Sequence, residues 1–266
     1  MSGKNLGGES DGKSSAKFMK KGRIPRMIRA LWTGATGMAS QQLLIDTVSN
    51  NLANVNTTGF KKQRVQFQDL YYANIPMGID STASVGNGSR TVATQRMFRQ
   101  GNIEESGDPL HAAIEGDGFF SIETGRGQAF TRDGSFRLDG SGRLVTSAGY
   151  ALSGTGVQIP LGATDIAILE NGAVVGRVDG LVQNPAGLEA TGGNLYVATR
   201  ASGEPEELTP GENGAGVLRG SYLETSNVDI VSEMVNLIVA QRAFELNSKT
   251  VETADQMWAI ANNVKG

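Results

Sequence analysis

Two parts of the chain place apolar side chains at every seventh position. Near the C-terminus the series is Ile230, Leu237, Phe244, Val251 and Trp258, and neither glycine nor proline occurs between residues 221 and 265. A seven-residue apolar period is typical of a helix that packs lengthwise against another helix. The pattern predicts a helix from about residue 228 to residue 264, roughly 55 Å long at 1.5 Å per residue. Ser226, with Asp229 three residues later, predicts the N-cap of this helix.

A second series lies near the N-terminus, at Leu31, Met38, Ile45 and Leu52, and Ala35 and Val48 widen it. It predicts a helix over residues 28–54. The residues that follow favour local hydrogen bonds to the backbone over helix, and the glycine among them supplies a positive φ. We therefore expect a helix exit, or hinge, at Asn54, Asn56, Thr57, Thr58 and Gly59.

Both apolar stripes are narrow, and Met234 widens the second one only near its start. A stripe of this kind can pack against one or two helices but cannot form a globular core. A helix of about 55 Å would also overhang a β domain whose radius of gyration is about 13 Å. We therefore expect a homo-oligomer rather than an intramolecular helical hairpin packed on the β part. The candidate interface consists of Leu31, Met38, Ile45, Leu52, Ile230, Met234, Leu237, Phe244, Val251 and Trp258.

The middle of the chain is rich in turns and holds most of the 36 glycines. Strand-like runs occur at residues 119–123, 129–131, 135–138 and 143–146. The pairs Asp133-Gly134, Asp139-Gly140, Asn171-Gly172 and Asp179-Gly180 are hairpin signals. Residues 204–216, with two prolines and three glycines, read as a linker.

The fold class is therefore α+β: long N- and C-terminal helices, paired as a coiled-coil-like core, with an inserted all-β central domain. The expected parts are a disordered extension (1–26), the helical assembly core (27–59 and 221–266), an extended linker or hairpin (60–102) and the β domain (103–220). Disorder at residues 1–26 follows from their Gly, Ser and Lys content.

Charge is unevenly spread along the chain. Residues 1–26 carry seven basic and two acidic side chains, so the remainder holds a net charge of -8 within the total of -3. An acidic body argues against a nucleic-acid partner. The basic extension lacks the apolar centre of a secretory signal peptide, and no apolar run is long enough for membrane insertion.

Candidate chemistry is sparse. There is no cysteine, and His111 is the single histidine, so thiolate and histidine-cluster metal sites are excluded. The one G-x-S-x-G match, at residues 8–12, lies in the basic extension, without the strand and helix that a nucleophile elbow needs. We predict no catalytic, cofactor-binding or metal-binding residue.

The two terminal segments resemble signature sequences of bacterial flagellar axial proteins, the rod and hook family. They are SNNLANVNTTGFKKQRVQFQDL (49–70) and YLETSNVDIVSEMVNLIVAQRAFELNSKTVETADQMWAIAN (222–262). The centre, including VATQRMFRQGNIEESGDPLHAAIEGDGFFSIETGRGQAFTRDGSFRLDGSGRLVTSAGY (92–150), is most similar to the distal rod members. The resemblance covers residues 27–266. The extension 1–26 is foreign to the family pattern, and the segment after Leu70 looks shorter.

The resemblance implies a structural protein, not an enzyme: a distal rod subunit that self-assembles into a helical drive shaft and transmits motor torque through the periplasm to the hook. The implied partners are further copies, other rod proteins, the hook protein, the P- and L-ring proteins and the type III export apparatus. The implied location is the basal body, from the periplasm to the outer-membrane level, reached without a cleavable signal peptide. The alternatives are another rod or hook subunit, or a cell-wall-remodelling enzyme.

Overall fold

The computed structural model describes residues 11–76, 82–153, 178–181, 184–208 and 215–264. The elements are α1 (Asp11–Ala53), β1 (Gln63–Asp69), β2 (Ala73–Pro76), β3 (Thr82–Val85), β4 (Ser89–Arg96), β5 (Ile103–Glu105), β6 (Ala112–Glu115), β7 (Phe120–Thr124), β8 (Gly127–Thr131), β9 (Arg137–Leu138), β10 (Leu144–Val145), β11 (Ala151–Leu152), β12 (Val178–Leu181), the 3-10 helix η1 (Pro185–Gly187), β13 (Glu189–Gly192), β14 (Leu195–Val197), β15 (Glu206–Leu208), β16 (Val217–Gly220), β17 (Tyr222–Glu224) and α2 (Ile230–Asn263). A helix near each terminus and a largely β centre give the α+β class that the sequence predicts.

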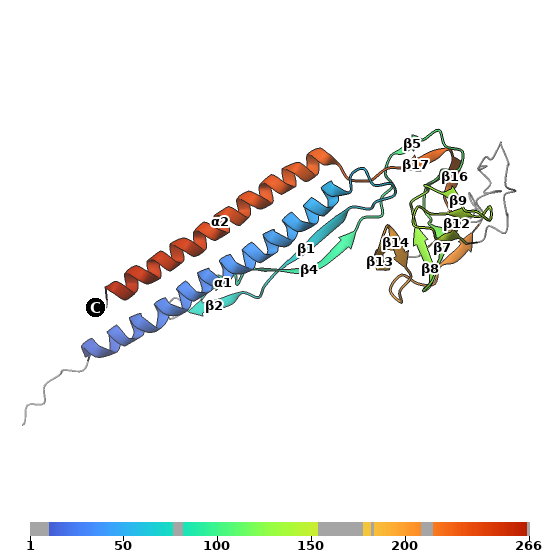
Figure 1. Ribbon diagram of the computed structural model, residues 1–266. Helices are drawn as coiled ribbons and strands as arrows, with labels where there is room; N and C mark the ends of the chain where they lie inside the picture. The colour runs from blue at the N-terminus through green and yellow to red at the C-terminus, as the bar shows by residue number, and fades with distance from the viewer. Residues whose placement is uncertain (1–10, 77–81, 154–177, 182–183, 209–214, 265–266) are drawn as a thin grey trace, which may run out of the picture. The chain divides into compact units, whose positions relative to one another are not determined.

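The chain divides into two compact units. A helical unit contains Met1–Asp46, Val65–Ala93 and Val235–Gly266, and a β unit contains Thr47–Arg64 and Thr94–Met234. In the helical unit α1 and α2 run side by side in opposite directions (Figure 1). Strand β1 pairs with β4, and the hairpin β2–β3 lies between them in the chain, with Ala73 opposite Val85.

Helix α1 begins earlier than the sequence predicts. The expectation of disorder over residues 1–26 is wrong for residues 11–26, which continue α1, while residues 1–10 lie outside the described part of the chain. Composition pointed to disorder because glycine, serine and charge dominate the segment. Alanine and lysine in this segment favour a helix, whereas Gly22 and Pro25, which also lie inside α1, disfavour it.

The largest sheet of the β unit has the strand order β13-β14-β8-β7-β11-β10-β9, and the recorded pairings between its neighbours are antiparallel. Both faces of its centre are buried. Phe119 packs with Phe130, Leu188 and Tyr196, whereas the next residue, Phe120, belongs to a separate cluster. That cluster also contains Ala112, Ile114, Ile122, Ala129, Phe136, Leu144, Leu152 and Leu218. Successive side chains on a strand point to opposite faces, so two adjacent phenylalanines serve two cores.

One hairpin signal behaves as predicted. Asp139 and Gly140 lie in the connection between β9 and β10, which pair with each other. The Asp139 carboxylate accepts bonds from the backbone N–H groups of Ser141 and Arg143 at 2.8 and 3.0 Å. These bonds hold the pKa of Asp139 well below its usual range.

The hairpin prediction at Asp133-Gly134 is wrong. These residues join β8 to β9, and neither strand pairs with the other. Gly134 is instead required by a close approach between two backbones: a Cβ there would lie 1.6 Å from the carbonyl oxygen of Ala112.

Two further predictions in the middle of the chain also need correction. Asp179 and Gly180 lie inside β12, which pairs with β15, so they do not form a turn. Because β15 occupies Glu206–Leu208, the segment 204–216 is not only a linker. Asn171 and Gly172 fall outside the described residues. Two residues that favour a turn can still form a strand when a distant strand pairs with them, and local sequence does not encode that pairing.

Candidate assembly face and chain junction

The seven-residue series on α2 follows the least exposed side of the helix. Leu237, Phe244 and Val251 are partly buried, and two alanines on the same side, Ala240 and Ala254, are buried. The remaining predicted positions on this helix are exposed: Ile230, Met234 and Trp258. The stripe is therefore covered along its middle and open at both ends.

On α1 the four predicted positions are partly buried, at Leu31, Met38, Ile45 and Leu52. Val48, expected to widen this stripe, is buried, but Ala35 is exposed and lies on another side of the helix. The role of the stripe residues in assembly stays a prediction at this point.

Two glycines that the sequence reasoning missed set the contact between α1 and α2. A Cβ on Gly34 would lie 2.7 Å from Cγ2 of Val251, and one on Gly37 would lie 2.9 Å from the Asn247 side chain. Glycine at these two positions therefore lets the helices approach closely. The sequence could have indicated this contact, because residues three apart in a predicted helix lie on the same side of it.

The predicted helix exit forms a compact polar turn in the β unit. Helix α1 ends at Ala53, and Asn54 bonds through Nδ2 to the carbonyl of Asn50 at 2.9 Å. The Thr57 hydroxyl donates to Asn54 Oδ1 at 3.2 Å, and the Thr58 hydroxyl donates to Asp133 at 2.8 Å. Asn56 is exposed. Local side-chain bonds thus end the helix, as their residue types suggest.

Gly59 has the positive φ that the sequence predicts, at +66°. It is also pressed against another segment, since a Cβ would lie 2.6 Å from the carbonyl carbon of Arg132. The Gly59 N–H donates to the carbonyl of Glu224 at 2.8 Å, which ties the helix exit to β17.

The charged centre of this junction is the carboxylate of Glu224, which is 1% exposed. Its Oε1 accepts from Lys61 Nζ at 2.6 Å and from the Gly101 N–H at 2.8 Å. Its Oε2 lies 3.4 Å from Nη1 of Arg132, another buried cation. One carboxylate thus joins the segment between α1 and β1, the loop before β5 and the residue that follows β8.

The two cations are further held by backbone carbonyls. Lys61 Nζ donates to the carbonyl of Arg99 at 3.0 Å, and Arg132 donates to those of Ile114 and Gly116 at 3.1 and 2.7 Å. Burial lowers the pKa of both cations below their ordinary values, and attraction to Glu224 opposes that shift in each. The charged state of Lys61 therefore depends in part on Glu224.

A second polar group ties the end of α1 to the start of α2. Glu233 is 1% exposed and accepts from Asn51 Nδ2 at 3.0 Å, while Lys62 Nζ lies 2.5 Å from its Oε1. The Asn51 amide also bonds in both directions to the backbone of Gln63, at 2.9 Å each way. These contacts fix where the chain leaves α1 relative to the first turn of α2.

The N-cap prediction at Ser226 is wrong, because Asp229 caps α2. The Asp229 carboxylate accepts from the Ser232 N–H at 2.8 Å, which lowers the pKa of this carboxyl. Asn227 holds the preceding backbone extended by bonding to Lys62 N–H and to the carbonyls of Met97 and Arg99. The helix therefore begins after this tethered segment, at Ile230.

The single histidine lies in a loop of the β unit. His111 Nδ1 is 2.8 Å from Ser106 Oγ, and its Nε2 is 3.8 Å from Asp108. The Ser106 hydroxyl donates to the carbonyl of Ser221 at 3.2 Å, which uses its proton in a backbone contact. Within the described residues, no group of three or more metal-ligating side chains is gathered, and no helix is long and apolar enough to cross a membrane.

A long pair of helices with uncovered apolar side chains, accompanied by a β unit that holds a buried ionic junction, is typical of a structural protein. Three family models match the chain: "Flagella basal body rod protein" at residues 31–61, "Flagellar hook protein FlgE/F/G D1 domain" at 113–176 and "Flagellar basal body rod FlgEFG protein C-terminal" at 219–264.

Comparison with individual proteins over nearly the whole chain identifies the family within this class. The chain is 45% identical to the flagellar basal-body rod protein FlgG of Borreliella burgdorferi over 264 aligned residues, covering 90% of this chain and 99% of that protein. It is 42% identical to FlgG of Caulobacter vibrioides, covering 90% of this chain and 100% of that protein. Similarity to the flagellar hook protein FlgE of Helicobacter mustelae, at 44%, covers 48% of this chain and 31% of that one. The chain belongs to the FlgG family of flagellar basal-body rod proteins.

Replacing Gly59 tests whether close packing at the helix exit requires glycine. Gly59→Ala should lower the free energy of unfolding by about 1–2 kcal/mol for the positive φ, with a further loss of about 1–3 kcal/mol from overpacking against Arg132. Gly107→Ala is the matched control, because Gly107 has a φ of +73° and no atom lies within 4 Å of its Cβ position. Urea unfolding followed by circular dichroism would compare the two. Equal losses would contradict the role of close packing.

Removing the Glu224 charge tests the ionic junction. Glu224→Gln leaves two buried cations without a carboxylate and should cost about 3–5 kcal/mol of unfolding free energy. Glu115→Gln is the control, because its partnership with Arg219 is about half exposed and such pairs contribute at most about 1 kcal/mol. Chemical denaturation of both variants at pH 7 makes the comparison, and similar small losses would show that Glu224 is not central.

The same variant should show a characteristic pH dependence. Without Glu224 the folded-state pKa of Lys61 falls further below the ordinary value of 10.5, so the unfolded chain binds more protons than the folded chain. Stability then rises with pH across that interval, and the deficit of Glu224→Gln relative to the parent chain should shrink toward pH 10. Denaturation curves at pH 7, 8.5 and 10 would check this. A deficit that stays constant would contradict the assignment.

Proposed function

We propose that the chain is a structural subunit of the flagellar distal rod, a helical drive shaft that transmits motor torque through the periplasm to the hook. The observation that carries the proposal is similarity along nearly the whole length of relatives named as basal-body rod proteins. The hook protein matches less of the chain and only a minor part of its own length, which favours a rod subunit over a hook subunit.

The geometry supports an assembling subunit rather than an enzyme. The described β unit buries its large side chains in two clusters, whereas α2 leaves Val231, Val235, Ile238, Val239 and Leu246 more than half exposed. Exposed apolar side chains concentrated on one element indicate a surface that another protein covers. The Ser106, His111 and Asp108 contacts do not resemble a catalytic triad, because Ser and Asp approach opposite nitrogens in the wrong order.

In the proposed subunit the two helices form a coiled-coil-like core. The ten stripe residues predicted from the sequence form its seam and continue into contacts with other copies at the open ends, Ile230 and Trp258. The turn at residues 54–59 is the exit from this core toward the β unit. The glycine contacts at Gly34 and Gly37 support the close pairing that this core requires.

The proposed partners follow from the place of a distal rod in the flagellum. They are further copies of the chain, other rod proteins, the hook protein, the P- and L-ring proteins and the type III export apparatus, without nucleic acid and without membrane insertion. The proposed location is the basal body, from the periplasm to the outer-membrane level.

The function is tested by replacement. Cells that lack their own distal rod protein should regain straight rods, hooks and motility when they produce this chain, as scored by electron microscopy and swimming assays. Curved tubes in place of straight rods would favour the hook alternative. Clearing of a cell-wall suspension by the purified chain would favour the cell-wall-remodelling alternative.

Substitutions on the stripe test which residues support assembly. Leu237→Ala and Phe244→Ala should each cost about 2–5 kcal/mol at a packed site, and a rod repeats that loss in every copy. Both variants should be exported but should leave cells without hooks. Glu245→Ala is the control, because Glu245 forms an exposed pair with Arg242 at 2.9 Å that contributes about 0.3–0.5 kcal/mol. Cell fractionation and hook counts would measure both effects. Loss of rods in Glu245→Ala with normal rods in Phe244→Ala would mean that the face is misassigned.

A further inference from the structure

Helix α2 carries a second apolar series, on the side turned away from α1. Val235, Leu246 and Met257 follow one another at intervals of eleven residues, and Ile238 and Ile260, which are 22 residues apart, lie beside them. All five side chains are more than half exposed. Eleven residues exceed three full turns by about 20°, so Val235, Leu246 and Met257 lie within about 40° of one another around the helix. This outer face is distinct from the seven-residue stripe that contacts α1.

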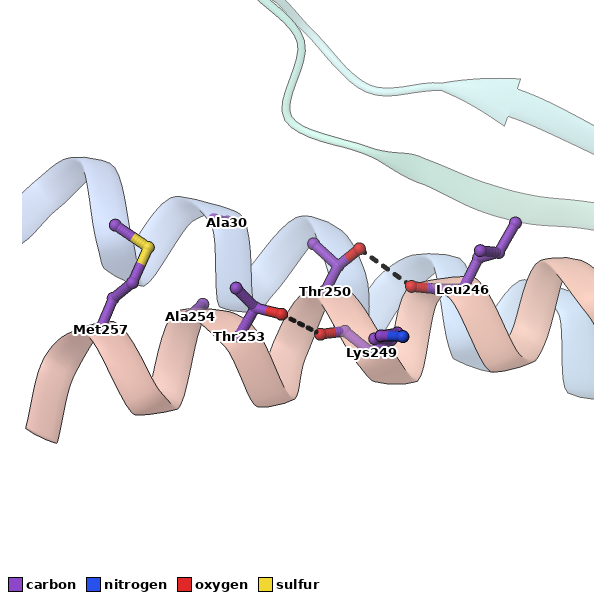
Figure 2. Close-up of a pocket in the computed structure, with 7 residues that line it drawn as sticks. All are labelled: Ala30, Leu246, Lys249, Thr250, Thr253, Ala254 and Met257. Atoms are coloured by element: carbon purple, nitrogen blue, oxygen red, sulfur yellow. Dashed lines mark hydrogen bonds between the residues drawn. The ribbon is translucent and has the colours of Figure 1, made fainter.

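A groove lies at one edge of this outer face, where α2 meets α1, and two of these residues bound it. A groove of about 440 Å³ lies between Leu246 and Met257, and Ala254, with Ala30 of α1, lines it (Figure 2). Two threonines complete the lining. The Thr250 hydroxyl donates to the Leu246 carbonyl at 2.9 Å, and the Thr253 hydroxyl donates to that of Lys249 at 2.7 Å. Because both hydroxyl protons are used within the helix, the methyl groups are free to line the groove.

The lining suits a flat aromatic ring. Two apolar side chains bound the groove lengthwise, methyl groups line it, and Lys249 supplies one ammonium group. An ammonium over a ring face is attractive, most strongly for an indole. The threonine oxygens retain an acceptor lone pair that an indole N–H can use. Tryptophan therefore fits this groove better than an aliphatic side chain does.

A tryptophan in a suitable setting lies on α1. Trp32 is 64% exposed, and the residues that follow on the same side, Ala35 and Ala39, are small and exposed. Small neighbours allow another helix to approach closely enough for the indole to enter a groove. Trp32 precedes Gly34 by two residues, which turns it about 200° around the helix from the contact with α2. It therefore points away from the groove of its own chain.

We propose that Trp32 of one copy inserts into the groove between Leu246 and Met257 of a second copy. This contact rests on the proposed rod function and deepens it by naming the two surfaces that meet. The surfaces differ, so each copy offers a tryptophan to one neighbour and a groove to another. Contacts of this heterologous kind do not pair off into closed dimers, and they generate helical assemblies when the rotation does not close.

The positions of two charged side chains are consistent with the same contact between copies. Copies in a polar assembly share one direction, so α1 of one copy runs antiparallel to α2 of the next. Asp46 follows Trp32 by fourteen residues, about 21 Å along the helix. The same distance back along α2 from the middle of the groove ends near Ile238, one turn from Arg242. Asp46 is exposed, with Gln42 donating to it at 3.0 Å, and the Arg242 side chain is 75% exposed and pairs with Glu245 of its own helix at 2.9 Å. One register therefore seats the indole and brings opposite charges together.

Site-specific photo-crosslinking tests the contact directly. A benzoylphenylalanine in place of Trp32 is introduced into the full chain in cells whose own distal rod protein is deleted, and basal bodies are isolated after irradiation. The expected adduct lies between residues 246 and 257 of a different copy, located by mass spectrometry, and is absent from dilute monomer. An adduct on the β2–β3 hairpin or in the β unit, or the same adduct in the monomer, would overturn the proposal.

Substitution gives a second, independent readout. Trp32→Ala should reduce the number of rods per cell at least tenfold and leave the melting temperature of the purified monomer unchanged, since Trp32 is exposed there. Tyr71→Ala is the control, at an aromatic side chain that is 94% exposed in the segment between β1 and β2, and it should stay within twofold of the parent. Equal behaviour of these two variants would count against the groove contact.

A charge exchange tests the register. Asp46→Arg and Arg242→Asp should each lower rod number at least fivefold, and the double variant should recover at least half of the parent value. Failure of the double variant to recover would reject the register. Absence of rods with the unmodified chain would instead reject the proposed function itself, so the two failures are distinguishable.

Discussion

The junction depends on one buried carboxylate. Glu224 accepts hydrogen bonds from Lys61 and from the Gly101 N–H and lies beside Arg132, although these groups come from stretches far apart in the sequence. A buried charge is tolerated only when its partners are in place. The segments that carry these groups must therefore adopt their folded positions together. Asn227 and Glu233, a few residues further on, extend the same constraint to the start of α2. Buried ionic and polar contacts therefore help to fix the position at which the chain leaves α1 and enters α2.

The two units bury their apolar side chains to different extents. In the β unit, adjacent residues such as Phe119 and Phe120 fill separate cores, and the large side chains of those cores are fully covered. Helix α2 is covered along its inner side only, where Ala240 and Ala254 are buried. A single chain thus covers the apolar cores of the β unit but leaves apolar side chains of α2 exposed. That asymmetry is expected of a subunit whose domain folds alone and whose helices are completed by other copies.

The sequence predicted the features that depend on local periodicity. The seven-residue series identified both helices, and the residue types at 54–59 identified the helix exit and the positive φ of Gly59. Predictions failed where distant partners decide the outcome. Asp179 and Gly180 form a strand because β15 pairs with them, and Ser226 does not cap α2 because Asn227 is tethered to Lys62. The Glu224 junction gave no sequence signal, because Lys61 and Glu224 are 163 residues apart. Gly34 and Gly37 could have been found from their spacing alone.

The two periods on α2 have different geometrical consequences. On a straight helix a seven-residue series drifts by about 20° per repeat, so it cannot face one straight neighbour along its whole length. The exposure pattern matches that drift, since the series is covered from Leu237 to Val251 and exposed at Ile230 and Trp258. The eleven-residue series from Val235 to Met257 drifts by about the same 20° per repeat, in the opposite sense, and covers only two repeats. The inner series therefore suits a partner of limited length within the chain. The outer series gives the same helix a second apolar face, which the chain itself leaves exposed.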